Sequence, residues 1–466
     1  MDPPLTKPSF NPNKHLKEEF VSNLSGSSML EIVALTVAIP ILVLIRHSIP
    51  SISITGASLK KKNDDVPSRN RSFIAYLATL SLDFLVIVVP MLLFFTVLAD
   101  WICILASLLA ILTLLYIAVK RSGGSSSSFE GEPNSLRAYI TSYRVIVMII
   151  TFLCILAVDF RIFPRRYAKT ETYGTSLMDL GVGAFVLANS LVSRQARNIT
   201  SVNWKTAIFS TSPLIILGFI RLITTTGVDY QVHVGEYGVH WNFFFTLAAV
   251  SILTSFVNIP PQYSGVFGSL VLVGYQFCLV HGLNHYLLSN ERGKDIISQN
   301  KEGIFSIFGY WGLYLLGVYL GNYLIFGSHS PGFRSSRWAW MRVWILSILF
   351  WLITMLLDRH VERVSRRTCN LPYVTIVLAD NLQLLAILMM ADLVPGNKTS
   401  ILEEAFNRNL LATFLLANIL TGLVNLSVDT LSASSFTALF ILLVYAYSLS
   451  IVIGIADYFG MKLKFW

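Results

Sequence analysis

The sequence predicts an all-α, polytopic membrane protein with about 13 transmembrane helices. Of its 466 residues, 54% are hydrophobic and 13% are charged, whereas a soluble domain is typically about 25% charged. Apolar runs close to the ~20 residues that span a bilayer recur from Met29 to Asp457. Within lipid each backbone polar group must be bonded inside its own element, so helices are the expected spanning structure.

The predicted spans follow one another with little chain left for a separate soluble domain. We expect a polar luminal segment at 1–28, a single multi-span transmembrane domain at 29–457 and a cytosolic tail at 458–466. Pro40, Pro90 and Pro213 fall inside spans and predict local kinks. The spans are expected at 29–46, 73–98, 101–119, 144–158, 175–193, 206–226, 243–257, 265–285, 305–326, 343–357, 371–391, 410–427 and 435–457.

Lys and Arg predict the orientation of these spans. With the N-terminus outside, 20 of the 35 basic residues fall in inside loops, which is the expected direction of the bias. Of the other 15, eight lie in two clusters on the outside, which suggests an anionic ligand there; generic lipid headgroups are the alternative. These clusters are Arg161, Arg165, Arg166 and Lys169, and Arg359, Arg363, Arg366 and Arg367.

The net charge of +9 agrees with cytoplasmic loops that face anionic lipid. No basic stripe interleaved with exposed aromatic residues supports binding to nucleic acid. The spacing of His281 and His285 suits a metal, but no third ligand is apparent, and the four cysteines form no CxxC pair. We therefore expect no metal site and no bound cofactor.

Residues 159–174 form a polar, cationic segment between two predicted spans. Asp159 ends an apolar run, so its carboxylate is partly desolvated, which raises its proton affinity. Lys169 follows ten residues later, and Pro164 breaks the helix between them. A turn back at Pro164 would bring Asp159 and Lys169 together as a pair that takes a proton from a hydroxyl and stabilises an oxyanion. An ordinary ion pair at the membrane boundary is the alternative.

Arg165 and Arg166 are candidates to bind a phosphate group, because each presents a planar fork of donors. Snorkelling to the lipid interface is the alternative. A second set of basic and polar residues, 366–373, enters the eleventh span and is expected to form another wall of the same site. It contains Arg367 and Asn370.

The span after this segment carries polar residues at helical spacing. Ser176, Asp179, Gly183 and Ser190 lie on one stripe. Asp179 is about one turn into the membrane, so it should face a cavity or a partner and not lipid. Simple helix–helix packing is the alternative reading of the stripe.

Small and amide residues of the same span predict close packing. Gly181 and Gly183 should permit another helix to approach closely. Asn189 is expected to be a buried amide. Asp83, Asp380 and Asn381 are further polar residues inside spans. Besides the residues of the 159–174 segment and Asp179, the residues expected to bind the substrate are Asn189, Arg367, Asn370 and Asn381.

Residues 159–183, which read DFRIFPRRYAKTETYGTSLMDLGVG, resemble the signature of the PIG-W family of glucosaminyl-phosphatidylinositol acyltransferases. The resemblance extends over nearly the whole chain. It includes 17–21 with Gly26 and Glu31, 302–304 with Gly309 and Tyr310, 366–367, 370–373 and Asn381.

The resemblance implies a multi-pass enzyme of the endoplasmic reticulum membrane that acts in GPI-anchor biosynthesis. Such an enzyme transfers a fatty acyl chain, usually palmitoyl, from acyl-CoA to the inositol 2-hydroxyl of glucosaminyl-phosphatidylinositol. The acidic and lysyl positions of the family motif fall on Asp159 and Lys169. Arg165 and Arg166 would then hold the phosphodiester, while Glu171 or Asp179 would pair with the glucosamine amine.

Two other classes of protein fit the composition. A transporter of a lipid or organic anion would also carry carboxylates inside its spans, although no internal repeat is visible. A non-catalytic subunit of the GPI pathway is the third possibility.

Overall fold

The computed structural model describes residues 16, 19–49, 72–122, 135–199, 204–227, 234–326, 336–393 and 399–463. Across these residues the chain is helical, and its β-type pairing is one isolated bridge between Gly26 and Thr175. The predicted all-α fold class is therefore confirmed. The expected loops at 60–65 and 123–128 lie outside the described residues.

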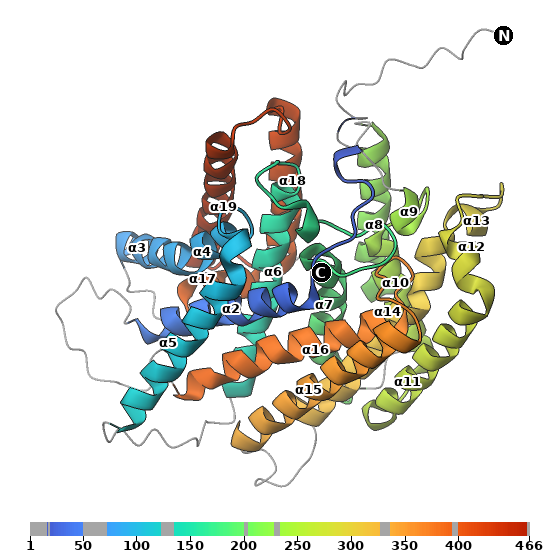
Figure 1. The fold of residues 1–466 in the computed structure, drawn as a ribbon, viewed down its shortest axis with the longest axis horizontal. Coiled ribbons are helices and arrows are strands. Elements are labelled where there is room, and N and C mark those ends of the chain that lie inside the picture. Colours follow the sequence, from blue (N-terminus) through green and yellow to red (C-terminus); the bar gives the residue numbers. More distant parts are fainter. Residues whose placement is uncertain are drawn as a thin grey trace.

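The helices follow the predicted spans in order (Figure 1). Three of the irregular turns, η1, η4 and η5, are π-helical, and η2, η3 and η7 are 3-10 helices. The elements are α2 (Met29–Ser48), α3 (Phe73–Asp83), η1 (Phe84–Val88), α4 (Val89–Phe94), η2 (Ala99–Trp101), α5 (Ile102–Ser122), α6 (Ser135–Ala157), η3 (Arg165–Tyr167), α7 (Leu177–Leu191), α8 (Trp204–Gly227), α9 (Val234–Tyr237), α10 (Phe243–Val257), α11 (Pro261–Cys278), η4 (Leu279–Leu283), α12 (Asn284–Leu288), α13 (Ile296–Gln299), α14 (Lys301–Gly321), η5 (Asn322–Phe326), α15 (Ser336–His360), α16 (Leu371–Leu388), η7 (Met389–Leu393), α17 (Ile401–Arg408), α18 (Leu410–Ser427) and α19 (Ser435–Tyr458).

Ten helical stretches in the described residues are long and apolar enough to cross a membrane. Three shorter apolar helices, Leu177–Leu191, Ile208–Thr224 and Phe243–Val257, fall in the other predicted spans. The chain is therefore a polytopic membrane protein, and the number of 13 crossings stays a prediction.

The three prolines inside spans behave differently. Pro90 follows directly on the π-helical segment η1, so the helix is irregular where a proline removes a backbone donor. Pro40 and Pro213 instead lie within the continuous helices α2 and α8.

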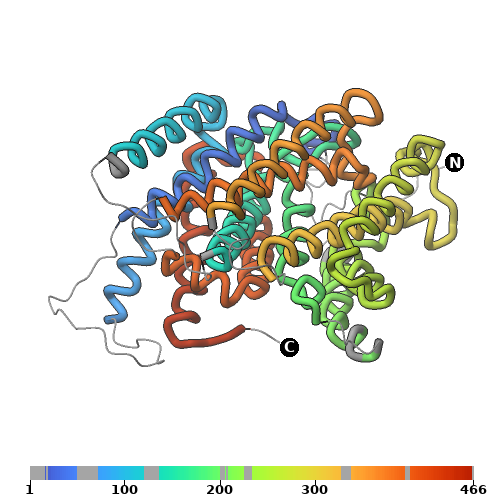
Figure 2. Tube along the Cα trace, turned by 90° about the horizontal axis from the view of Figure 1, so that it is seen from below, coloured from blue at the N-terminus to red at the C-terminus, as the bar shows by residue number. Residues whose placement is uncertain are grey.

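Helix α16 is the centre of the bundle. Every residue from Pro372 to Leu388 is buried, and the helix packs against α15, α2, α6 and α7. Figure 1 shows α15 and α16 running side by side. Figure 2 shows the blue to cyan helices of the first third of the chain at one edge and the green to yellow helices of 204–300 at the other.

Glycines let the short helix α7 fit closely between α14 and α16. A Cβ on Gly183 would lie 2.6 Å from Val377 Cγ2, and one on Gly317 would lie 1.8 Å from Ser190 Oγ. The close approach predicted for Gly183 is thus confirmed, whereas Gly181 has open space beside it and the prediction is wrong there. This packing fixes the N-terminal end of α7, which carries Asp179.

Candidate functional site

The 159–174 segment begins where α6 ends, at Ala157, and turns back at Pro164. Pro164 precedes the short helix η3, and its carbonyl accepts a hydrogen bond from Tyr167 N at 3.0 Å. The predicted break at Pro164 is therefore confirmed. Arg165 holds this turn, because its Nη2 donates to the carbonyls of Val158, Phe160 and Phe163 at 3.0, 3.1 and 2.8 Å.

Arg165 and Arg166 of this segment are both directed at groups of the chain itself. Burial lowers the pKa of Arg165 to about 10. Arg166 donates from Nε to Glu31 Oε1 at 2.8 Å and from Nη2 to Asp100 Oδ1 at 2.6 Å. Tyr167 Oη donates to the same Glu31 oxygen at 2.7 Å. The two guanidinium groups expected to bind phosphate thus hold the turn together and tie it to α2 and η2.

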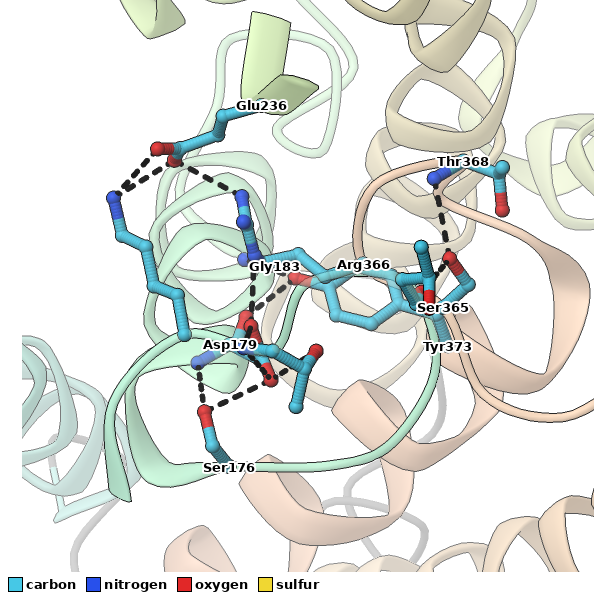
Figure 3. Close-up of polar contacts among 11 residues, drawn as sticks. Ser176, Asp179, Gly183, Glu236, Ser365, Arg366, Thr368 and Tyr373 are labelled. Atoms are coloured by element: carbon cyan, nitrogen blue, oxygen red, sulfur yellow. Dashed lines mark hydrogen bonds and ion pairs between the residues drawn. The ribbon is translucent and has the colours of Figure 1, made fainter. Parts of the chain in front are cut away.

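Four charged side chains from four segments form an ion-pair network, in which Asp179 and Arg366 are buried and Lys169 is 39% exposed (Figure 3). Arg366 lies at its centre, with Nε 2.8 Å from Asp179 Oδ1 and Nη1 3.0 Å from Glu236 Oε1. Lys169 Nζ lies 2.8 and 3.0 Å from the two Glu236 oxygens. We call these four residues the charged network; two cations balance two carboxylates, so it carries no net charge.

Asp179 is saturated with hydrogen bonds. Besides Arg366, it accepts from Thr170 Oγ1 at 2.9 Å, from Thr170 N at 3.2 Å and from Ser176 Oγ at 2.8 Å. Ser176 is also the N-cap of α7. A buried carboxylate requires such partners, so the prediction that Asp179 faces a partner and not lipid is confirmed. These contacts leave it little capacity to bind a substrate amine.

Glu236 links the two cations of the network. Burial by itself would raise the pKa of Glu236, but Lys169 and Arg366 lower it to about 2. Burial would likewise lower the pKa of Arg366, whereas Glu236 and Asp179 raise it well above its ordinary value. Each charge therefore depends on the others being in place.

The loop between α15 and α16 forms the second wall of the site, as predicted. Ser365 Oγ donates to Thr172 O at 2.6 Å, and Gly174 N donates to Val364 O at 2.9 Å. Asn370 caps α16, because its Oδ1 accepts from Tyr373 N at 3.1 Å. Asn370 therefore helps to shape this wall, and its contact with a substrate stays a prediction.

A second ion-pair cluster flanks the charged network. Arg367 Nη2 lies 3.1 Å from Glu302 Oε1, and Arg292 Nη2 lies 2.6 Å from the same oxygen. Glu302 is in the first turn of α14. A Cβ on Gly235 of α9 would lie 3.1 Å from Arg367 Cζ, so α9 is held between the two clusters.

Asp159 and Lys169 have separate partners in this structure. Asp159 is 4% exposed, and its Oδ2 accepts a hydrogen bond from Asn425 Nδ2 of α18 at 2.7 Å. Lys169 is directed at Glu236. Their action as a catalytic pair stays a prediction. Glu171 is exposed at the surface of the segment.

Two residues expected at the site lie elsewhere. Asn189 is exposed and not buried, and as the thirteenth residue of α7 it lies ~18 Å along the helix from Leu177. Asn381 lies in the middle of α16, ~15 Å from its start, where it accepts from Tyr143 Oη at 3.0 Å and donates to Val377 O at 2.7 Å. The prediction that Asn189 is a buried amide is wrong, because Asn189 lies beside the buried stripe of α7 that includes Ser190 and not on it.

Glu236 is the member of the network that sequence reasoning missed. It lies in a four-residue helix in the connection between α8 and α10. A single acidic residue in a short loop carries no periodicity and no motif that would select it. Glu302, in contrast, lies in one of the segments that carried the family resemblance.

The fold and this site define a polytopic all-α membrane protein with a buried, charged site at one end of its helix bundle, where α6 ends and α7, α14 and α16 begin. The chain belongs to the GWT1 family, whose pattern it matches over residues 13–456. The predicted family resemblance is confirmed by relatives that bear PIG-W and GWT1 names.

Similar proteins cover most of the chain. An uncharacterized protein of Arabidopsis thaliana is 60% identical over 435 residues, which are 91% of this chain and 98% of the relative. A Dictyostelium discoideum protein named phosphatidylinositol-glycan biosynthesis class W protein is 38% identical, over 72% of this chain and 76% of the relative. A Schizosaccharomyces pombe protein named GPI-anchored wall transfer protein 1 is 34% identical, over 92% and 95%.

Proposed function

We propose that this protein acts in GPI-anchor biosynthesis as a multi-pass enzyme of the endoplasmic reticulum membrane. In this proposal it transfers a fatty acyl chain, expected to be palmitoyl, from acyl-CoA to the inositol 2-hydroxyl of glucosaminyl-phosphatidylinositol. The family and the names of its relatives support the role in the pathway. The observation that carries the chemistry is Asp159, a nearly buried carboxylate at the mouth of the bundle that is held by Asn425.

The proposed reaction requires one base and one group that stabilises negative charge. Asp159 would take the proton of the inositol hydroxyl while the hydroxyl oxygen attacks the acyl carbonyl carbon. The ammonium of Lys169 would stabilise the oxyanion of the tetrahedral intermediate. The C–S bond then breaks, the electron pair leaves on the CoA sulfur, and that sulfur takes the proton from Asp159. A thioester is already activated, so the proposal assigns no step to a metal.

The charged network has a clear place in this scheme. Glu236 holds Lys169 on one side, and Arg366 fixes Glu236 on the other. Because a catalytic group must be held in a defined geometry to act efficiently, we assign Glu236 and Arg366 a positioning role. For Lys169 to contact the oxyanion, one of two things must happen when the substrate binds. Either Lys169 Nζ moves away from Glu236, or the oxyanion lies next to both Lys169 and Glu236.

The main competing function is transport of a lipid or organic anion. It is suggested by the carboxylates inside the predicted spans. Asp83 is paired with Arg46, whose Nε lies 2.5 Å from Asp83 Oδ1, and Asp179 is paired with Arg366. Pairing with arginine explains Asp83 and Asp179 without an ion path. Asp380 of α16, the third such carboxylate, is buried and has no ion pair among the described residues, so a transport assay and the acyl-transfer assay decide between the two functions.

The test is acyl transfer by the purified single chain. The protein in detergent is incubated with radiolabelled palmitoyl-CoA and glucosaminyl-phosphatidylinositol, and the labelled lipid is separated by chromatography. Transfer by the wild type and its loss in Asp159→Asn support the proposal. No transfer by a correctly folded wild type would point to a transporter or a non-catalytic subunit.

A further inference from the structure

A pocket of about 460 Å³ lies outside the charged network, against the 159–174 segment that also carries Asp159. Three parts of the chain line it: the N-terminal segment, the 159–174 segment and the connection between α18 and α19. Its lining residues include Glu19, Phe20, Arg161, Asp429, Leu431 and Ser432. Arg161 is two residues from Asp159. Asp429 is four residues beyond Asn425, the residue that bonds to Asp159, and lies just past the end of α18.

Arg161 is the available cation of the 159–174 segment. Arg165 is bonded to carbonyls, Arg166 to two carboxylates and Lys169 to Glu236. Among the described residues, Arg161 has no ion pair, and its side chain is exposed in the pocket. A phosphate group near Asp159 would therefore meet Arg161 without breaking an existing contact.

The same pocket carries two carboxylates opposite in charge to Arg161. Glu19 and Asp429 are both exposed. Asp429 uses one oxygen, Oδ1, to accept a hydrogen bond from Leu431 N at 3.2 Å, which holds the side chain in its turn. The pocket thus presents one cation and two anions around a partly apolar floor.

One wall of the pocket is held firmly. The Phe20 ring lies 3.9 Å from Arg165 Cζ, a cation–π contact with the arginine that organises the 159–174 turn. The N-terminal segment is also tied to this turn, because Glu171 N donates to Leu24 O at 2.9 Å and Ser27 N donates to Thr175 O at 2.8 Å. The pocket is therefore built by the same contacts that place Asp159.

We propose that this pocket binds the zwitterionic headgroup of the acceptor lipid, with Arg161 on the phosphodiester and Glu19 and Asp429 on the glucosamine ammonium. The inositol ring connects these two charged groups, so this arrangement holds the ring between them and beside Asp159. Arg suits a phosphodiester because its fork donates two hydrogen bonds, and a carboxylate suits an ammonium as a charged acceptor. The proposal rests on the proposed function and assigns the acceptor to residues other than Arg165, Arg166 and Asp179.

The first test separates the two charged contacts by kinetics. Arg161→Gln should raise KM for glucosaminyl-phosphatidylinositol about tenfold, as expected for loss of one charge-assisted hydrogen bond, and leave KM for palmitoyl-CoA unchanged. The KM of Arg161→Lys for glucosaminyl-phosphatidylinositol should lie between those of the wild type and Arg161→Gln. Asp429→Asn and Glu19→Gln should reduce the preference for the amine-bearing acceptor over its N-acetylated form. Lys294→Gln and Glu291→Gln, which change exposed charges elsewhere, serve as matched controls.

The second test measures binding without turnover. Fluorescent glucosaminyl-phosphatidylinositol is titrated onto the protein in nanodiscs in an Asp159→Asn background, with and without Arg161→Gln. Weaker binding in the double variant supports the pocket, and equal binding overturns it whatever the catalytic result. The pocket proposal would also be overturned if the wild type transfers acyl groups and every pocket variant keeps the wild-type KM for glucosaminyl-phosphatidylinositol and the wild-type preference for the amine-bearing acceptor. A wild type that binds the lipid through Arg161 but does not transfer would instead reject the acyltransferase function alone.

Discussion

Replacing Glu236 by Gln tests whether the charged network is a stabilising unit. The substitution keeps the size of the side chain but removes the charge that faces Lys169 and Arg366. The pKa of Glu236 is lowered from its ordinary 4.5 to about 2, which corresponds to about 3 kcal/mol at ~1.4 kcal/mol per pH unit. The Glu236 side chain is 16% exposed, but its partner Lys169 is 39% exposed, so solvent screens part of this interaction and the figure is an upper bound.

We therefore expect Glu236→Gln to lower stability by about 1–3 kcal/mol at neutral pH. The loss arises because Arg366 stays charged and its side chain is only 4% exposed. In the variant this buried charge has one carboxylate partner, Asp179, instead of two. Thermal unfolding in detergent measures it, with a thiol-reactive dye that reports exposure of the buried Cys154 and Cys369. The exposed Cys103 and Cys278 are replaced by Ser beforehand.

The pH dependence gives the sharper test. Because the folded pKa of Glu236 is lowered, its stabilisation is complete above about pH 4.5 and is lost as the pH falls toward about 2. The stabilities of wild type and Glu236→Gln should thus differ most at neutral pH and converge in acid. Glu291→Gln, at an exposed acid, should follow the wild type. Equal midpoints for wild type and Glu236→Gln at pH 7 would refute the reasoning.

Three further outcomes are expected. Asp159→Asn should lower acyl transfer at least about 100-fold, the scale of general base catalysis, with an unchanged unfolding midpoint; normal turnover would exclude Asp159 as the base. Gly309→Ala should destabilise the protein by about 1–3 kcal/mol, because its Cβ would lie 2.0 Å from the backbone oxygen of Cys369, whereas Gly422→Ala, in open space, should not. A cysteine at the exposed Lys294, on the predicted luminal side, should react with an impermeant reagent in sealed microsomes only after permeabilisation; reaction before it would reverse the predicted orientation.

The local features of this protein follow from the sequence alone. Runs of apolar residues near the length of a bilayer determine helices wherever the chain lies in lipid, because the backbone has no other way to satisfy its polar groups. Pro164 determines that no regular helix continues through the 159–174 segment, since proline cannot donate within a helix; α6 itself already ends at Ala157. The position of Asp179 one turn into an apolar helix determines that it has a partner, because an unpaired carboxylate there is costly.

Which partner each charge takes is decided by the tertiary structure. Arg165 and Arg166 have the same local sequence context, yet one binds carbonyls of its own turn and the other binds Glu31 and Asp100. Lys169 meets Glu236, which is 67 residues away along the chain. Long side chains reach whatever the packed helices bring within a few ångströms, and electrostatic attraction depends on that distance and not on sequence separation. The packing of α7 against α14 and α16, with α9 beside it, therefore determines the charged network.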